Sequence, residues 1–114
     1  MNVFFSLVFN LFFIISDRKQ WTVHGIWPTK NFTIGPLYCN RSVHFDFETL
    51  KPILDDLELH WTNVRANTEL DNFWQHEWEK HGTCAMQLEV VNNEYKYFNK
   101  GKSLNSVVLK SKPM

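Results

Sequence analysis

The sequence lacks an excess of either charge, an internal repeat, and any apolar run long enough to cross a bilayer. Twelve basic and twelve acidic side chains give a formal net charge of zero. This balance argues against a general nucleic-acid coat but leaves room for a local cationic site that handles one phosphate. The apolar run from Val3 to Ile15 falls short of the roughly 20 residues that a membrane-spanning helix needs. With 114 residues and no linker, the chain is expected to form one small domain or part of one.

The same N-terminal run has the length of the apolar part of a secretory signal peptide. It reads VFFSLVFNLFFII, although no Lys or Arg precedes it and Phe-Ile-Ile-Ser is a poor cleavage site. We interpret residues 1–16 as a possible signal peptide and residues 17–114 as the domain. A buried strand is the structural alternative.

Cysteines and glycosylation sequons also indicate the secretory route. The chain has two cysteines, Cys39 and Cys84, and sequons that begin at Asn31 and Asn40. If the cysteines pair, they close a loop of about 45 residues, which the chain-entropy model credits with roughly 4 kcal/mol. Two unpaired buried thiols are the alternative, preferred for a cytosolic protein.

Hydrophobic periodicity predicts the elements in the first half of the chain. Trp21 to His24 alternates in a β-prone manner, and the strand is expected to end near the tryptophan-proline pair at residues 27–28. Residues 29–42 are rich in Gly, Pro, Asn and Thr and predict a loop. Leucine and isoleucine recur at helical spacing over residues 50–57 and predict a packing helix.

A second helix is predicted to begin at Asn72, which can form a capping-box-like pair with Gln75, and to stop near Gly82. Residues 88–98 predict short strand or helix pieces. The lysine-rich tail, residues 99–114, is expected to be a solvated terminus. Two further histidines, His44 and His60, are interpreted as ordinary loop or surface residues.

The stretch FWQHEWEKHGTC, residues 73–84, concentrates ionisable side chains. At about 100° per residue, its polar side chains fall on one face of a helix, while Trp74 and Trp78 form an i,i+4 pair suited to anchoring that helix on a core. The polar residues are His76, Glu77, Lys80 and His81.

Zinc binding is one interpretation of this stretch, because His-Glu opens a metalloprotease motif. That motif requires a second histidine four residues later, where this chain has Lys80, whose ammonium would repel a dication. A zinc-binding module built on four side chains is therefore an alternative with no spacing rule in its favour. These side chains are His24, His76, His81 and Cys84.

Proton transfer is the interpretation that uses every polar residue of the stretch. Two histidines that titrate near neutrality can serve as base and acid on opposite sides of a reacting centre. A lysine beside them supplies charge to an oxyanion, and a carboxylate can orient an imidazole. Such a set suits phosphoryl transfer with an internal nucleophile and needs no metal or other cofactor. An ordinary solvated helix face is the alternative.

Two segments together resemble a known enzyme family. WTVHGIWP, residues 21–28, followed by the stretch at residues 73–84, resembles the two active-site segments of the ribonuclease T2 family of acid endoribonucleases. CNRS, residues 39–42, resembles the animal members. The resemblance, which covers residues 21–109, implies an α+β fold with an antiparallel sheet packed against helices. It also implies a secreted or lysosomal enzyme that cuts single-stranded RNA through a 2′,3′-cyclic phosphate to 3′-phosphate ends.

The resemblance assigns a role to each ionisable residue. His81 matches the general base and His24 the general acid of the family. His76 matches the histidine that helps to hold the phosphate. Glu77 and Lys80 match the pair that stabilises the pentacovalent transition state.

Three further positions follow from the same resemblance. Trp27 matches the aromatic residue that stacks on a base. Cys39 and Cys84 match a family disulfide that ties the loop to the end of the catalytic helix. Thr29 stands where many members have an aspartate that helps to read the base, so no base preference is predicted.

The resemblance leaves parts of the family scaffold without a counterpart. No first core strand is recognisable before Trp21, and the carboxy-terminal strands are missing, so a partial domain is expected. Because catalysis by a positioned acid and base is sensitive to displacements of about 1 Å, a catalytically weak or inactive relative that binds RNA or a protein partner is the alternative function.

Overall fold

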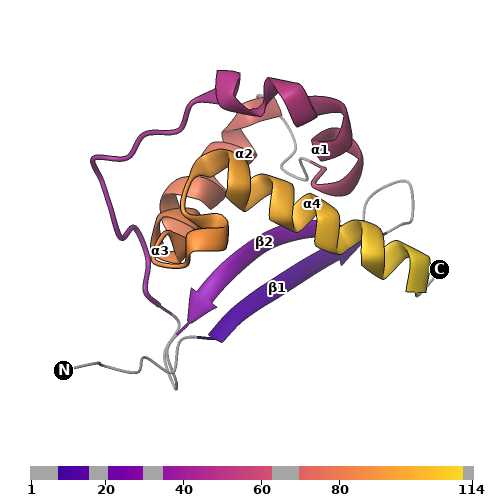
Figure 1. The fold of residues 1–114 in the computed structure, drawn as a ribbon, viewed down its shortest axis with the longest axis horizontal. Helices are drawn as coiled ribbons and strands as arrows, with labels where there is room; N and C mark the ends of the chain where they lie inside the picture. The colour runs from indigo at the N-terminus through magenta and orange to yellow at the C-terminus, as the bar shows by residue number, and fades with distance from the viewer. Residues whose placement is uncertain (1–7, 16–20, 30–34, 63–69, 112–114) are drawn as a thin grey trace.

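Helices gather on one side of a two-stranded antiparallel sheet in a computed structural model of the chain (Figure 1). The structure describes residues 8–15, 21–29, 35–62 and 70–111. Within them, no helix combines the length and the apolar character that crossing a membrane requires. The predicted α+β class with an antiparallel sheet is confirmed.

The sheet pairs β1 (Val8–Ile15) with β2 (Trp21–Thr29). No core strand was expected before Trp21, but β1 lies there, in agreement with the alternative interpretation of the N-terminal run as a strand. Its run of β-branched and aromatic residues favours extended backbone. Asn10 is opposite Trp27, so β1 supports the segment that contains the first predicted site residues.

The pairing register skips one residue at His24. Phe12 is opposite Gly25, whereas Phe13 is opposite Val23. Such a bulge bends the strand and re-aims a side chain. The strand then continues through Pro28 to Thr29 and ends beside the tryptophan-proline pair, as predicted.

The predicted packing helix forms in two parts. It begins as a 3₁₀ helix, η1 (Phe47–Ile53), in which Asp46 accepts a hydrogen bond from the backbone nitrogen of Glu48 at 3.1 Å, and continues as α1 (Leu54–His60). Pro52 lies near the junction, where its missing N–H group disfavours a continuous α-helical pattern.

The second predicted helix starts earlier and ends later than expected. It runs from α2 (Leu70–Glu77) through the π-helical turn η2 (Trp78–Gly82) into α3 (Thr83–Ala85), so Asn72 lies inside it. Gly82 does not stop the helix. A Cβ atom at Gly82 would collide with the Trp78 ring, so this glycine permits close packing. Trp74 and Trp78 are buried, as predicted.

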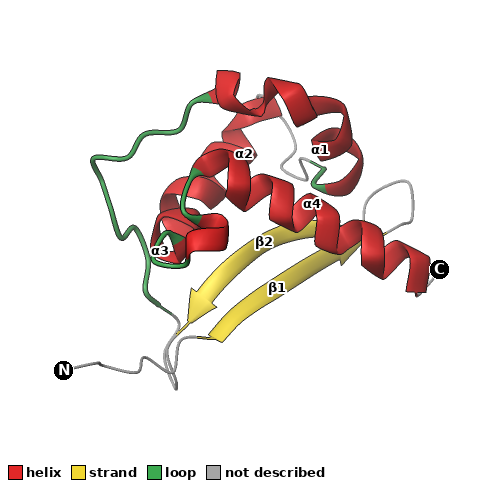
Figure 2. Ribbon diagram, in the orientation of Figure 1, coloured by secondary structure: helices red, strands yellow, loops and turns green. Residues whose placement is uncertain are grey.

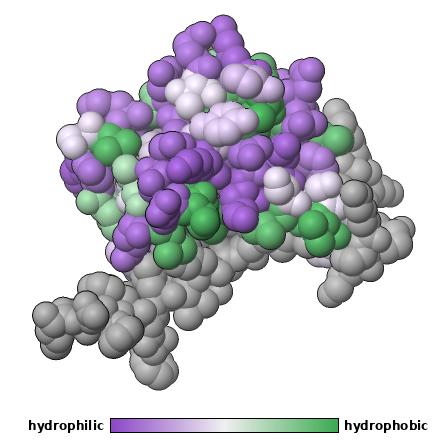
Figure 3. Space-filling model, in the orientation of Figure 1, coloured by the Kyte–Doolittle hydropathy of each residue, from purple (hydrophilic) through white to green (hydrophobic). Residues whose placement is uncertain are grey.

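The predicted solvated terminus, residues 99–114, is instead helical as far as Ser111, and part of this helix is buried. After η3 (Glu89–Val91), the chain forms the long helix α4 (Glu94–Ser111), which Figure 2 shows as one continuous helix. Gly101 and Asn105 of this helix are buried. Gly101 packs against the ring of Trp61. Figure 3 shows that the face of the helices turned toward the viewer is mostly hydrophilic, with apolar residues in separate groups.

Trp61 connects the core to the bulged strand. Its ring lies 4.6 Å from that of Phe98 and 5.5 Å from that of Tyr97. Its indole nitrogen donates to the backbone oxygen of His24 at 3.1 Å, and the Tyr97 hydroxyl donates to the oxygen of Ile26 at 2.9 Å. These two hydrogen bonds hold β2 on both sides of Gly25.

Candidate active site

His24 projects from the bulge of β2 toward aromatic rings. Its imidazole makes edge contacts with Trp27 and Phe73, with ring centroids 5.4 Å apart in each case. Phe73 is buried and was not predicted as a site residue, although it begins the stretch that contains the other candidates. These two rings therefore limit the directions in which the imidazole can point.

Glu77 is a buried carboxylate shared between two residues of β2. Its side chain is 2% exposed. Oε1 accepts a hydrogen bond from the indole nitrogen of Trp27 at 2.8 Å, and Oε2 lies 3.7 Å from Nε2 of His24. A Cβ atom at Gly25 would collide with both Glu77 and Trp27. Gly25 was not predicted as a site residue, although it lies between His24 and Trp27 in the motif.

His81 stacks on the indole ring of Trp27, with centroids 4.4 Å apart and the planes inclined by 15°. Its Nδ1 is buried and makes no hydrogen bond to the part of the chain that the structure describes. The pKa of His81 is lowered to about 3, chiefly by burial and in smaller part by the positive charges of Lys80, His76 and His24. The imidazole is therefore neutral, and able to accept a proton, above about pH 3.

One cavity of about 260 Å³ collects the predicted catalytic and base-binding side chains. Leu37, from the loop that precedes the disulfide, also lines it and was not predicted. All four polar side chains of the second segment line this cavity, in agreement with the helical spacing that places them on one face. The lining residues are His24, Trp27, Leu37, His76, Glu77, Lys80 and His81.

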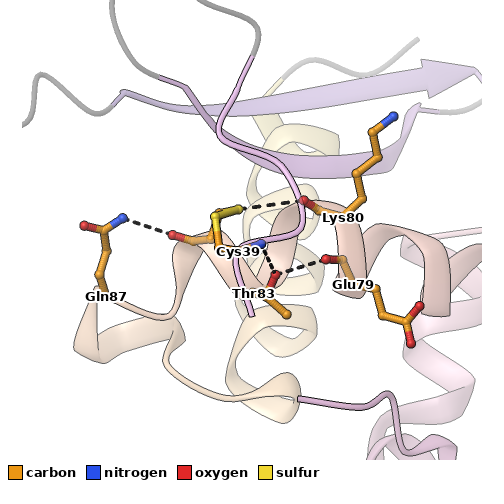
Figure 4. The surroundings of a disulfide bond; sticks show 6 residues. Cys39, Glu79, Lys80, Thr83 and Gln87 are labelled. Carbon is orange, nitrogen blue, oxygen red and sulfur yellow. Dashed lines mark hydrogen bonds between the residues drawn. A yellow bond between two sulfur atoms is a disulfide. The ribbon is translucent and has the colours of Figure 1, made fainter. Parts of the chain in front are cut away.

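The disulfide between Cys39 and Cys84 fastens the loop to the helix that contains Lys80 and His81. The backbone nitrogen of Tyr38 donates to the oxygen of Lys80 at 2.9 Å. Figure 4 shows the hydroxyl of Thr83 between its two partners: it accepts from the nitrogen of Cys39 at 3.2 Å and donates to the oxygen of Glu79 at 3.0 Å. The predicted pairing is confirmed, and the loop is held where Leu37 reaches the cavity.

The remaining predicted positions lie elsewhere. Asn40 is exposed on the loop, and Asn31 lies outside the described residues. His60 is not an ordinary surface residue: its Nδ1 lies 2.9 Å from Nδ2 of buried Asn105, and burial lowers its pKa. The zinc alternative lacks its thiolate, because Cys84 is in the disulfide. Among the described residues, no three His, Cys, Asp or Glu side chains are placed so that they could hold a metal ion.

The bulged strand and the helix meet at three histidines, a lysine and a buried carboxylate, and they define an α+β protein with a candidate acid–base site. The sequence profile of the ribonuclease T2 family matches residues 10–111, and the chain belongs to this family. The match begins inside β1, in agreement with the strand seen there.

The chain is similar to named ribonucleases and to a solved ribonuclease structure. Ribonuclease Oy of Magallana gigas is 41% identical over 95 residues, which are 82% of this chain and 45% of that protein. Human ribonuclease T2 is 41% identical over 97 residues, 79% of this chain and 36% of that protein. The crystal structure of human RNase T2 superposes with a TM-score of 0.67, covering 80% of this chain and 47% of that one. The chain spans less than half of each of these relatives.

Proposed function

We propose that this chain cleaves single-stranded RNA by acid–base transphosphorylation with its own side chains and without a metal. The observation that carries the proposal is the joint cavity, in which His24, Lys80 and His81 meet and the pKa of His81 is about 3. A neutral imidazole beside an ammonium is the arrangement that proton abstraction next to a phosphate requires. Structures of similar RNase MC1 mutants contain 5′-GMP and 5′-UMP, which supports a nucleotide ligand.

In the first step, His81 takes the proton of an RNA 2′-hydroxyl, and the 2′-oxygen forms a bond to the adjacent phosphorus. The bond from phosphorus to the 5′-oxygen breaks, and His24 donates a proton to that leaving oxygen. The product is a 2′,3′-cyclic phosphate. In the second step, water adds with His24 as base and His81 as acid, and the ring opens to a 3′-phosphate.

The other cavity residues act on charge and position. Lys80 supplies positive charge to the phosphoryl oxygens of the pentacovalent transition state, and His76 contacts the phosphate. Glu77, in the cavity wall, holds Trp27 and attracts the protonated form of His24 across 3.7 Å. One face of Trp27 lies on His81, and the opposite face is proposed to stack on a base.

A gel assay of refolded, oxidised protein on single-stranded RNA near pH 5, with a chelator present, tests this function. Cyclic-phosphate ends are expected from the parent and none from His81→Ala, with circular dichroism showing that both are folded. Activity that disappears with chelator and returns with a divalent cation would overturn the metal-free chemistry. Folded parent protein that binds RNA without cutting it would favour the catalytically weak relative.

We further propose secretion or delivery to lysosomes and endosomes, with glycosylation at Asn31 and Asn40. A tomato relative, 31% identical over 87 residues, is named an extracellular ribonuclease. The signal peptide at residues 1–16 stays a prediction, and cleavage after residue 16 would remove β1 from the sheet. Amino-terminal sequencing of protein from a secreting cell distinguishes the two arrangements: a start at Asp17 indicates the signal peptide, and a start before Val8 indicates that β1 is kept.

A further inference from the structure

A second cavity, of about 240 Å³, lies next to the loop that the disulfide fastens. Glu79 and Lys80 are neighbours in η2, yet Figure 4 shows their side chains pointing in opposite directions. Lys80 lines the proposed RNA site and Glu79 lines this second cavity. Its lining residues are Tyr38, Asn40, Arg41, Val43, His44 and Glu79.

Asn40, the first residue of the second sequon, is held in a tight turn beside this cavity. Its Oδ1 accepts hydrogen bonds from the backbone nitrogen of Ser42 at 3.1 Å and from the Ser42 hydroxyl at 2.6 Å. Both bonds use the amide oxygen, so they leave Nδ2, the atom that glycosylation modifies, outside the turn. Asn40 and Ser42 are exposed, so the folded protein has room for a glycan at this position.

Tyr38 provides an aromatic wall two residues before the sequon asparagine. Its backbone has a φ of 51°, a conformation that residues with side chains rarely adopt, and this turn brings its ring to the cavity that Asn40 also lines. The guanidinium of Arg41 lies 5.3 Å from the centre of the Tyr38 ring. The lining of the cavity thus combines an aromatic ring, Tyr38, with a carboxylate, Glu79.

We propose that this cavity seats the first sugar of an N-linked glycan on Asn40. A pyranose has an apolar C–H face that packs on an aromatic ring, and hydroxyl and acetamido groups that donate to a carboxylate or an imidazole. RNA fits less well, because Glu79 would repel a phosphate and Arg41, the arginine of this lining, is engaged with Tyr38. The inference rests on the secretory route proposed above.

The attachment step requires a lipid-linked oligosaccharide diphosphate as co-reactant. Nδ2 of Asn40 forms a bond to the anomeric carbon of the first sugar and loses one proton. The bond from that carbon to the diphosphate oxygen breaks, and the lipid diphosphate leaves. The two hydrogen bonds from Ser42 to Oδ1 are compatible with the product, because the amide oxygen is unchanged.

A seated sugar would stabilise the loop that borders the active site. Tyr38 is the residue whose backbone nitrogen donates to Lys80 at 2.9 Å, and Cys39 follows it. Contacts between the first sugar and Tyr38 would therefore oppose opening of this loop. The second and later sugars would extend into solvent and add little.

Glycan trimming tests the proposal. Protein with Asn31→Gln, so that only the Asn40 sequon remains, is secreted from a eukaryotic cell, and mass spectrometry measures occupancy. Melting temperatures are compared for the full glycoprotein, for protein trimmed to its first sugar by an endoglycosidase, and for the same variant made without glycan and refolded. The trimmed form is expected to melt with the full form, and the form without sugar several degrees lower.

Tyr38→Ala distinguishes binding of the first sugar in the cavity from its covalent attachment to Asn40, since it leaves the sequon intact. It is expected to remove the difference in melting temperature between glycosylated and unglycosylated protein. Tyr95→Ala on α4 is the control; it lowers both melting temperatures because Tyr95 packs on the core, and it keeps their difference.

Three results would contradict binding of the first sugar in this cavity. They are an Asn40 that carries no glycan, a trimmed form with the melting temperature of the unglycosylated form, and a Tyr38→Ala variant in which the glycan still raises the melting temperature. A raised KM for RNA in unglycosylated Tyr38→Ala would assign the cavity to RNA instead. Each result is independent of the proposed catalysis. Cleavage of RNA by protein that carries no glycan on Asn40 would support the proposed function alone. A glycan that raises the melting temperature of inactive protein would support sugar binding in the cavity alone.

Discussion

The indole nitrogen of Trp27 donates to Oε1 of Glu77 over 2.8 Å, and this hydrogen bond joins β2 to α2 across 50 positions of sequence. Because the other oxygen of Glu77 faces His24 and the face of Trp27 lies on His81, one indole ring contacts or orients three residues of the proposed mechanism. The arrangement makes the active site depend on the approach of the strand to the helix. Trp27 is therefore expected to position catalytic groups in addition to any contact with a base.

Trp27→Phe removes the donor to Glu77 and keeps an aromatic ring on His81. Loss of a hydrogen bond to a buried charged group is expected to cost about 1.5–3 kcal/mol of stability. Displacement of Glu77 and His24 is expected to lower kcat by up to about 100-fold. Urea unfolding and single-turnover RNA cleavage measure the two effects.

Trp78→Phe is the matched control, because the Trp78 indole nitrogen is buried without a hydrogen-bond partner among the described residues. Trp78→Phe makes the same change from indole to phenyl but removes no hydrogen bond, so kcat should be kept. Equal losses of activity in the two variants would refute the positioning role of Trp27.

Gly25→Ala tests how closely strand and helix must approach. The added methyl group would collide with the Glu77 carboxylate and the Trp27 indole, so the two elements must move apart. Overpacking of this kind is expected to cost about 1–3 kcal/mol and to lower activity more than stability explains. Gly35→Ala, whose new methyl group would meet a backbone nitrogen at 3.6 Å, is the control and should change activity little. Full activity of folded Gly25→Ala would show that the site tolerates a wider approach.

The pKa of His81 gives a prediction for the acid limb of the pH–rate profile. Burial is the largest cause of its lowering to about 3, and Lys80 is the next. Lys80→Met removes a positive charge, so the pKa of His81 should rise and the acid limb should move to higher pH, whatever happens to the maximal rate. NMR titration of the His81 imidazole reports the shift directly. Lys96→Met, on the exposed side of α4, should leave it unchanged, and an unshifted His81 in Lys80→Met would contradict the electrostatic account.

The paired active-site segments could be predicted from sequence because they depend on local spacing and on a specific motif. Helical periodicity placed the polar residues of the second segment on one face, and the resemblance supplied the first segment and the disulfide. The bulge at His24 could not be predicted, because it is defined by the register with β1, which was interpreted as a signal peptide.

The C-terminal helix was missed for a different reason. Four lysines between residues 100 and 112 suggested a solvated tail, whereas Tyr97, Phe98, Gly101 and Asn105 recur at helical spacing and are buried. A glycine and an asparagine do not mark an apolar stripe. Their burial depends on the ring of Trp61 and on His60, which are distant in sequence.

The disulfide should contribute much of the stability of so small a chain. Replacing both Cys39 and Cys84 by alanine opens a loop with a sequence separation of 45, and the expected loss is about 4 kcal/mol. Equilibrium urea unfolding of the variant beside the oxidised parent measures it. A loss below about 1 kcal/mol would mean that the unfolded chain is already constrained.

Glu94 is expected to make the fold more stable in acid. Its carboxylate is buried at the start of α4; Oε1 accepts from the backbone nitrogen of Asp46 at 2.8 Å, while Oε2 has no partner among the described residues. Burial raises the pKa of Glu94 to about 7, from 4.5 in the unfolded chain. Between these two values the folded state keeps a proton that the unfolded state has lost. The free energy of unfolding should therefore fall as the pH rises through this window.

Glu94→Gln removes this titration and stays neutral at every pH. Near pH 4.5 the variant should be about as stable as the parent. Above pH 7 it should be more stable by about 2–3 kcal/mol, because the pKa difference between the folded and unfolded states limits the free energy that the titration can contribute. Urea unfolding across this pH range measures the difference between the two proteins, so other titrating groups cancel. Glu89→Gln, an exposed carboxylate of η3, is the control. A constant difference between parent and Glu94→Gln would mean that Glu94 titrates alike in both states, and acid stability would then have to come from another group.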